Sequence, residues 1–178
     1  MTPALPSPPT VSSWRYWVPL PPRLDLPLGQ IPPDFALWDA TSDRTVRLAN
    51  WRGKQPVVIT FVRGGADLVY SPQRYAHLVA MNEAYPTFRN AGAEVLAVIP
   101  AVPRQGQAMV SDLHLTLPLL CDPTGDSFRR YHTGQAGGAP LPAQFVLDAQ
   151  GRLRSSHLFS LLHSHADPAQ LLAKVEAL

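Results

Sequence analysis

Cysteine is the side chain best suited to redox chemistry at neutral pH, and this sequence holds only one, Cys121. A single thiol excludes an internal disulfide, a two-cysteine relay within the chain and any multi-thiolate metal site. Cys121 follows an apolar stretch and precedes Asp122-Pro123. A lone cysteine in that setting is most often a small buried hydrophobe, and the alternative is a nucleophile activated by the next helix start.

Three histidines, His157, His163 and His165, lie close together near the C-terminus. His163 and His165 would share a face if their segment were extended. Without a carboxylate or a helical spacing they are weak evidence for a metal. We therefore expect surface histidines, no bound metal and no cofactor.

The charge of the chain points to no particular partner. Fifteen basic and 13 acidic residues give a formal charge of +2, without the Lys/Arg run that nucleic-acid binding needs. No apolar stretch reaches the roughly 18 residues of a membrane span, and the N-terminus lacks the basic start and apolar core of a signal peptide. We expect a cytoplasmic protein with no nucleic-acid or membrane partner, and a homodimer stays open.

The N-terminal segment differs from the rest in its proline content. Residues 1–33 hold half of the 20 prolines, which fix φ and remove backbone donors. We predict a proline-rich extended arm over residues 1–33 and one globular domain over residues 34–178. Trp14, Tyr16, Trp17 and Val18 would anchor this arm on its own core or on a partner.

Apolar patterns predict the elements that hold the candidate residues. Buried strands are expected at 56–62 and 94–99, with a helix from Ser71 between them that Pro86 kinks or ends early. This order implies a right-handed parallel crossover. The remaining expected elements are a hairpin at 35–48, strands at 117–120, 144–147 and 153–158, and helical segments at 105–113, 122–131 and 168–178. The pattern predicts an α/β fold with a central mixed sheet flanked by helices.

Six strings, in this order, resemble the alkyl hydroperoxide reductase and thiol-specific antioxidant family, the peroxiredoxins. They are Pro33-Asp34-Phe35-Ala36-Leu37, Trp51-Arg52-Gly53-Lys54, Val57-Val58-Ile59-Thr60-Phe61, Gly92-Ala93-Glu94-Val95-Leu96-Ala97-Val98, Leu119-Leu120-Cys121-Asp122-Pro123 and Phe145-Val146-Leu147-Asp148. The resemblance spans residues 29–178 and implies a thioredoxin-like, peroxiredoxin-type fold. It does not by itself imply the chemistry.

The loop that carries the reactive cysteine in this family is altered here. In peroxiredoxins the pattern P-x-x-x-T-x-x-C places the cysteine at a helix N-terminus, which lowers the pKa of the thiol. On that pattern Arg63, Asp67 and Tyr70 stand at the proline, the threonine and the cysteine. A neighbouring branch reads R-G-G-W-C-x-x-C and matches Arg63-Gly64-Gly65, but Asp67 and Tyr70 then replace its two cysteines. The arginine that stabilises the family's thiolate corresponds to Pro142.

These replacements remove the residues that peroxide reduction needs and leave a candidate binding site. A phenol forms no sulfenic acid, so peroxide reduction at Tyr70 is unsupported. Tyr70 and Asp67 either cap the helix and fill the old pocket, or join Arg63 in a loop that holds a small anion, which Asp67 would repel. Leu141-Pro142 resembles the cis-proline loop of thioredoxin folds. We therefore predict a cis peptide there and a groove towards Tyr70 that binds a partner.

Two functions follow from this sequence. The first is a redox-inactive peroxiredoxin-like domain, not an enzyme, that binds an unknown protein or small molecule. Its contact is the groove of Arg63, Asp67, Tyr70 and Pro142, or the N-terminal arm. The alternative is a thiol-dependent peroxidase or oxidoreductase in which Cys121 acts with an external thiol. The missing residues favour the first, and we predict that Cys121 is buried and slow to react.

Overall fold

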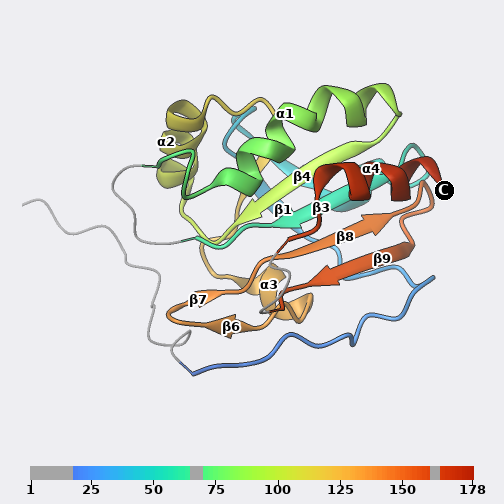
Figure 1. The fold of residues 1–178 in the computed structure, drawn as a ribbon, viewed down its shortest axis with the longest axis horizontal. Coiled ribbons are helices and arrows are strands. Elements are labelled where there is room, and N and C mark those ends of the chain that lie inside the picture. The colour runs from blue at the N-terminus through green and yellow to red at the C-terminus, as the bar shows by residue number, and fades with distance from the viewer. Residues whose placement is uncertain (1–17, 65–69, 161–164) are drawn as a thin grey trace, which may run out of the picture.

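A computed structural model describes residues 18–64, 70–160 and 165–178. Figure 1 shows a central twisted sheet with helices on both of its faces. The strands are β1 (Ala36–Asp39), β2 (Arg44–Arg47), β3 (Val57–Phe61), β4 (Glu94–Ile99), β5 (Leu119–Cys121), β6 (Gln135–Ala136), β7 (Ala139–Pro140), β8 (Ala143–Leu147) and β9 (Leu153–Leu158). The helices are the 3₁₀ turn η2 (Leu48–Trp51), α1 (Ala76–Asn90), α2 (Pro103–Leu113), α3 (Asp126–Arg130) and α4 (Pro168–Glu176).

Seven strands form one mixed sheet, as expected from the sequence. Their order is β2-β1-β5-β4-β3-β8-β9. The central strands β3, β4 and β5 are parallel, whereas β1, β8 and β9 pair with their neighbours in the antiparallel sense. Helices α1 and α2 make the two parallel crossovers, and a small hairpin of β6 and β7 precedes β8. The sequence patterns did not predict this hairpin, because its strands have only two residues each.

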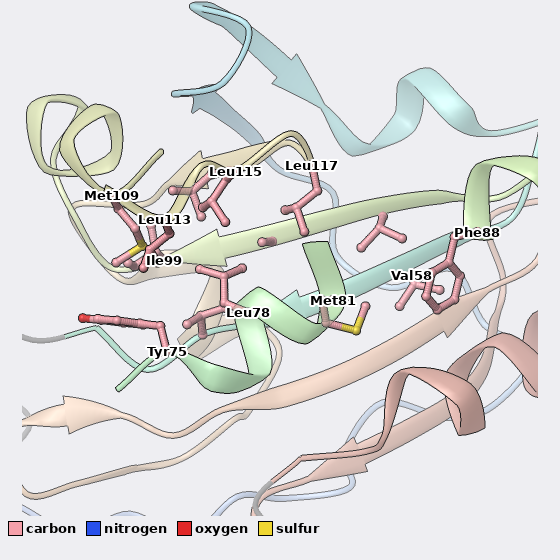
Figure 2. Packing of buried hydrophobic residues seen from close by; sticks show 14 of the residues in the cluster. Val58, Tyr75, Leu78, Met81, Phe88, Ile99, Met109, Leu113, Leu115 and Leu117 are labelled. Atoms are coloured by element: carbon pink, nitrogen blue, oxygen red, sulfur yellow. The ribbon is translucent and has the colours of Figure 1, made fainter. Parts of the chain in front are cut away.

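The side chains of β3 alternate between two hydrophobic clusters. Val58 packs in the cluster covered by α1, α2 and α4, whereas Ile59 and Phe61 pack in the cluster covered by α3. Figure 2 shows the α1 side of the first cluster, with Tyr75 at its end and the tyrosine hydroxyl directed away from the other labelled side chains. The sheet therefore has two different buried faces.

Helix α1 departs from the prediction at its start and at Pro86. It begins at Ala76, because the residues after Ser71 form a turn that buries Tyr75. It then continues past Pro86 to Asn90, so the predicted early end at Pro86 is wrong. Proline removes one backbone hydrogen bond, but buried side chains before and after Pro86 pack on the sheet and hold the helix together. These side chains are Leu78, Met81 and Phe88.

The described part of the N-terminal arm, residues 18–33, runs in extended form along the edge of the molecule (Figure 1). Leu20 forms a bridge with Gln135 of β6, and the Gly29 N–H donates to the Leu153 carbonyl at 2.7 Å. The predicted anchors Trp14, Tyr16 and Trp17 lie outside the described residues. Among the residues that are described, no helix is long and apolar enough to cross a membrane.

Candidate functional site

The end of β3 and the start of α1 bring Thr60 and His77 together. Alternation along β3 turns Thr60 towards α1, between Ile59 and Phe61, which face the other way. The Thr60 Oγ1 atom lies 3.3 Å from His77 Nε2, within hydrogen-bond distance. Thr60 is fully buried, so this pair is a polar contact beneath the protein surface.

Tyr70, which stands where the family pattern has cysteine, is a core residue. Its side chain is 5% exposed and packs edge-on against Tyr75 at 5.7 Å between ring centroids. Its backbone N–H lies 3.5 Å from a carboxylate oxygen of Asp112 in α2. The phenol therefore fills space in the core beside Tyr75. Asp67, the other replaced position, lies outside the described residues.

A cavity of about 420 Å³ lies beside the start of α1, where the strands β3 and β8 meet their loops. Its walls come from the β3 loop, the first turn of α1, the residue before β8 and the segment after β9. The lining residues are Val62, Arg63, Gly64, Arg74, Tyr75, Ala76, His77, Leu78, Pro142, Phe159 and His165. Two of the four predicted binding residues, Arg63 and Pro142, therefore line one cavity, and Tyr70 lies in the core next to its Tyr75 wall.

Arg63 fixes one rim of this cavity to the β6–β7 hairpin. Its Nη2 atom donates to the carbonyl oxygens of Ala136 and Gly137, at 2.8 and 3.2 Å. Gly137 has a positive φ of 56°, and a Cβ there would lie 3.1 Å from Arg63 Nη2. The hairpin thus holds the guanidinium in place through uncharged acceptors.

The predicted cis peptide before Pro142 is wrong. All peptide bonds of the described residues, including Leu141–Pro142, are trans. The β6–β7 hairpin sets the path into β8 instead, with the Leu141 N–H donating to the Gly134 carbonyl at 3.0 Å. The groove that we inferred from a cis-proline loop is therefore not supported. The cavity is defined by its lining residues alone.

The histidines near the C-terminus are not simple surface residues, which corrects the expectation from their spacing. His165 stacks on His77 with ring centroids 4.2 Å apart, and His157 is half-buried. Burial, followed by repulsion from His165 and His157, lowers the pKa of His77 from 6.5 to about 3. Burial also lowers the pKa of His165. Both stacked imidazoles are consequently neutral at pH 7, and His163 lies outside the described residues.

A row of polar side chains crosses the sheet beneath these rings. Thr60, Gln144 and His157 are directly opposite one another on β3, β8 and β9, so they share one face. Gln144 Oε1 accepts the Ala166 N–H at 2.9 Å. Gln144 Nε2 and His157 Nε2 are buried without a hydrogen-bond partner among the described residues. Unpaired buried polar atoms cost stability, so this row is not explained by packing alone.

Cys121 lies away from the cavity, on β5. It is 2% exposed, and burial raises the pKa of its thiol to about 11. Helix α2 crosses so close that a Cβ at Gly106 would approach Cys121 Sγ to 2.3 Å. The predicted burial of Cys121 is confirmed. In the described part of the chain, no three His, Cys, Asp or Glu side chains are grouped to hold a metal ion.

Sequence reasoning missed three residues that line the cavity: His77, Arg74 and Phe159. The first two lie in or just before the first turn of α1. Their side-chain types could have suggested a site there. Phe159 follows the end of β9 and has no comparable pattern in the sequence.

The AhpC/TSA family matches residues 28–156, and the chain belongs to this family. The fold agrees with solved peroxiredoxins. Peroxidoxin BcpB from Mycobacterium tuberculosis gives a TM-score of 0.71 at 20% identity, covering 86% of this chain and 98% of that one. PrxQ from Xylella fastidiosa gives 0.73 at 14% identity, covering 87% and 98%. The expected thioredoxin-like, peroxiredoxin-type fold is confirmed.

Named relatives by sequence are redox proteins. A thiol-disulfide oxidoreductase ResA from Geobacillus thermodenitrificans is 30% identical over 128 residues, 71% of this chain and 67% of that protein. The chloroplastic peroxiredoxin Q of Populus jackii is 31% identical over 126 residues, 69% of this chain and 56% of that protein. The chain thus spans little more than half the length of this peroxiredoxin Q.

Proposed function

We propose that the chain is a redox-inactive peroxiredoxin-like domain that binds a ligand in the cavity between Arg63, His77 and Pro142. The observation that carries the proposal is the environment of Cys121, the sole thiol of the chain. With its pKa raised to about 11, about one molecule in 10⁴ carries a thiolate at pH 7. The thiol is buried and is not part of the cavity lining. Because the thiolate is the nucleophile, this position suits packing better than catalysis.

The position of Tyr70 supports the same proposal. The family pattern needs a thiol at the end of the loop, whereas this chain has a buried phenol packed against Tyr75. A phenol neither forms a sulfenic acid nor exchanges disulfides. The cavity beside it remains large enough for a ligand, since small-molecule sites occupy roughly 300–1,000 Å³.

The comparisons favour a second function, thiol-dependent peroxidase or oxidoreductase, more than the first, because the named relatives are redox proteins. In that function the Cys121 thiolate attacks the peroxide O–O bond, forms a sulfenic acid and releases water or an alcohol. Two external thiols then return the sulfenic acid to the thiol and form a disulfide. The burial of Cys121 and the raised pKa of its thiol are our reasons for ranking this function second.

A peroxide-consumption assay with an external thiol donor separates the two functions. We expect the protein to consume hydrogen peroxide no faster than an equal concentration of free cysteine, and Tyr70→Cys to give at most partial activity. Turnover by the unchanged protein that Cys121→Ser abolishes would establish the redox function. Turnover that survives Cys121→Ser would point to a contaminant.

Thiol labelling tests the environment of Cys121 directly. Native protein should react with a thiol reagent at pH 7 at least about 100-fold more slowly than free cysteine, because attack requires an exposed thiolate. Protein unfolded in denaturant should react with one equivalent within seconds. Equal rates for the native and unfolded protein would contradict the proposal.

The partner is a small molecule under this proposal, and a homodimer is compatible with it. The unpaired thiol of Cys121 supports a reducing location such as the cytoplasm. Sedimentation of the purified chain at several concentrations measures the oligomeric state.

A further inference from the structure

The cavity beside α1 has a one-sided charge. Its described lining contains two guanidinium groups and two imidazoles, and no carboxylate. The imidazoles of His77 and His165 are neutral at pH 7, because burial lowers the pKa of both. The positive charge at the cavity therefore comes from the arginines, and the histidines contribute neutral polar edges.

Arg63 keeps its charge uncompensated where its contacts are described. Its guanidinium donates to two backbone carbonyls, which orient the group without neutralising it. Both hydrogen bonds come from the same nitrogen, Nη2. A planar guanidinium has five N–H donors, so the oriented group retains donors for a carboxylate.

A second cavity, of about 440 Å³, provides the contrast. It is lined by the arm and by α3, and its lining includes Arg23, Arg129 and His132. There the charges are paired: Asp25 lies 3.3 Å from Arg23 and 3.9 Å from His132, and Asp126 lies 2.9 Å from Arg129. Arg63 thus differs from the cations of the second cavity, because its described contacts are backbone carbonyls and not carboxylates.

Apolar and aromatic side chains share the lining of the cavity beside α1 with its basic groups. They are Val62, Tyr75, Ala76, Leu78, Pro142 and Phe159. Two carboxylates near the site serve other groups: Asp112 accepts from the Tyr70 N–H, and Asp167 caps α4 by accepting from the Ala169 N–H at 2.8 Å. A ligand that fits must carry one negative group on an apolar body.

Resting on the proposed binding function, we propose that this cavity binds a small carboxylic acid with an apolar tail. The carboxylate lies against the Arg63 guanidinium, and the tail packs against Phe159 and Pro142. The neutral imidazole of His77 belongs to the same lining and adds a polar edge to the cavity. A charge-assisted hydrogen bond is worth about 1.5–3 kcal/mol, or at least a tenfold difference in affinity.

The experiment compares three probes that share one tail: hexanoate, hexanamide and hexylammonium. Each is titrated into the whole protein while backbone amide shifts are followed by NMR at pH 7. The Gly64 and Ala76 amides report on this cavity, and the Gly134 and Gln135 amides report on the second one. We expect hexanoate to bind at Gly64 and Ala76 at least tenfold more tightly than hexanamide, with hexylammonium weakest.

Variants then assign the charge. Arg63→Gln should weaken hexanoate about tenfold or more and change hexanamide by less than about twofold. Arg63→Lys should recover part of the loss, and it also checks that the β6–β7 hairpin stays folded. Arg129→Gln, which lines the second cavity, is the matched control and should leave both affinities unchanged.

The possible outcomes separate the ligand class from the binding function. Equal binding of hexanoate and hexanamide at Gly64 and Ala76 would overturn the acid and leave a binding site for neutral apolar molecules. Shifts confined to the Gly134 and Gln135 amides would place the acid in the second cavity and would overturn the inference. Binding of none of the three probes would overturn the inference, and the peroxide assay would still decide whether the domain is redox-inactive.

Discussion

The two faces of the sheet are built by the same strands and have opposite character. On the α3 side, Phe61 lies between Phe128, Tyr131 and Phe145, with ring centroids 4.9, 5.0 and 5.8 Å away. On the α1 side, the neighbouring residue Thr60 belongs to a polar row that meets the histidine pair and the cavity. A one-residue step along β3 thus separates a closed aromatic core from the candidate site.

The difference indicates which face carries function. The interlocking rings around Phe61 bury apolar area efficiently. The cavity that Phe128 lines on this side has its basic side chains paired with carboxylates. A row of polar side chains with unpaired buried atoms lowers stability, and such features concentrate at functional positions. The α3 face therefore stabilises the fold, and the α1 face is where we expect binding.

The largest expected effect is on the aromatic face. Phe61→Ala should lower the free energy of unfolding by about 4 kcal/mol, because it empties a fully buried site with three ring contacts. Phe159→Ala, at the cavity, should cost about 1 kcal/mol or less, since that ring is half-buried. Urea unfolding measures the loss in free energy of unfolding for each variant. Equal losses would contradict the difference between the two faces.

The histidine layer predicts acid sensitivity on the other face. Since the pKa of His77 is about 3 in the folded protein and 6.5 when unfolded, the unfolded state binds more protons between these values. The contribution of neutral His77 to the free energy of unfolding is therefore fully present above pH 6.5, and it is lost as the pH decreases towards 3. Between pH 7 and pH 4.5 the loss should be on the order of 2–3 kcal/mol.

The variant His77→Gln isolates this effect. Its loss of stability between pH 7 and pH 4.5 should be clearly smaller than that of the natural chain, because the variant has no imidazole at this position to protonate. Chemical unfolding at each pH provides the curves. Parallel curves for the two proteins would assign the acid sensitivity to other groups.

A tight helix crossing predicts the next effect. Gly106→Ala should lower stability by about 2 kcal/mol, because the new Cβ would approach Cys121 Sγ to 2.3 Å and Ala40 Cβ to 3.0 Å. Combining it with Cys121→Ala should recover part of the loss, which gives a favourable coupling energy in a double-mutant cycle. Additive losses would mean that α2 shifts away instead of pressing on the sulfur.

The smallest expected effect concerns the polar row itself. Thr60→Val keeps the shape of the side chain and removes the contact to His77 Nε2 at 3.3 Å. We expect a loss of about 1 kcal/mol in thermal unfolding, close to the net value of one hydrogen bond. A gain in stability would mean that the hydroxyl is kept for a purpose other than holding His77.

Local patterns predicted most of the fold. The β-branched run at Val57–Phe61 defines β3, because burial on both faces of the sheet imposes this pattern directly. Pro86 misled the prediction, since tertiary packing of Phe88 outweighs one missing hydrogen bond. The trans peptide before Pro142 depends on the β6–β7 hairpin, whose two-residue strands carry no pattern.

Only some residues of the candidate site could be predicted from the sequence. Arg63 and Pro142 were identified because they stand at positions that the family pattern marks, and both line the cavity. The contact between His77 and His165 joins residues far apart in the sequence, so only the docking of α1 against the segment before α4 brings them together. The family pattern also marked Tyr70. It could not predict that this side chain is buried, because the burial depends on packing with Tyr75.

The inaccessibility of Cys121 has a practical consequence for spectroscopy. Most proteins must lose their native cysteines before a fluorophore or spin label can be attached at one chosen site, and that removal often disturbs the core. Here the native thiol is shielded by the sheet and by α2. Gln73→Cys would place a reactive thiol at an exposed position next to the cavity-lining Arg74. A brief labelling step would then modify that position alone and give a reporter beside the cavity in an otherwise unaltered chain.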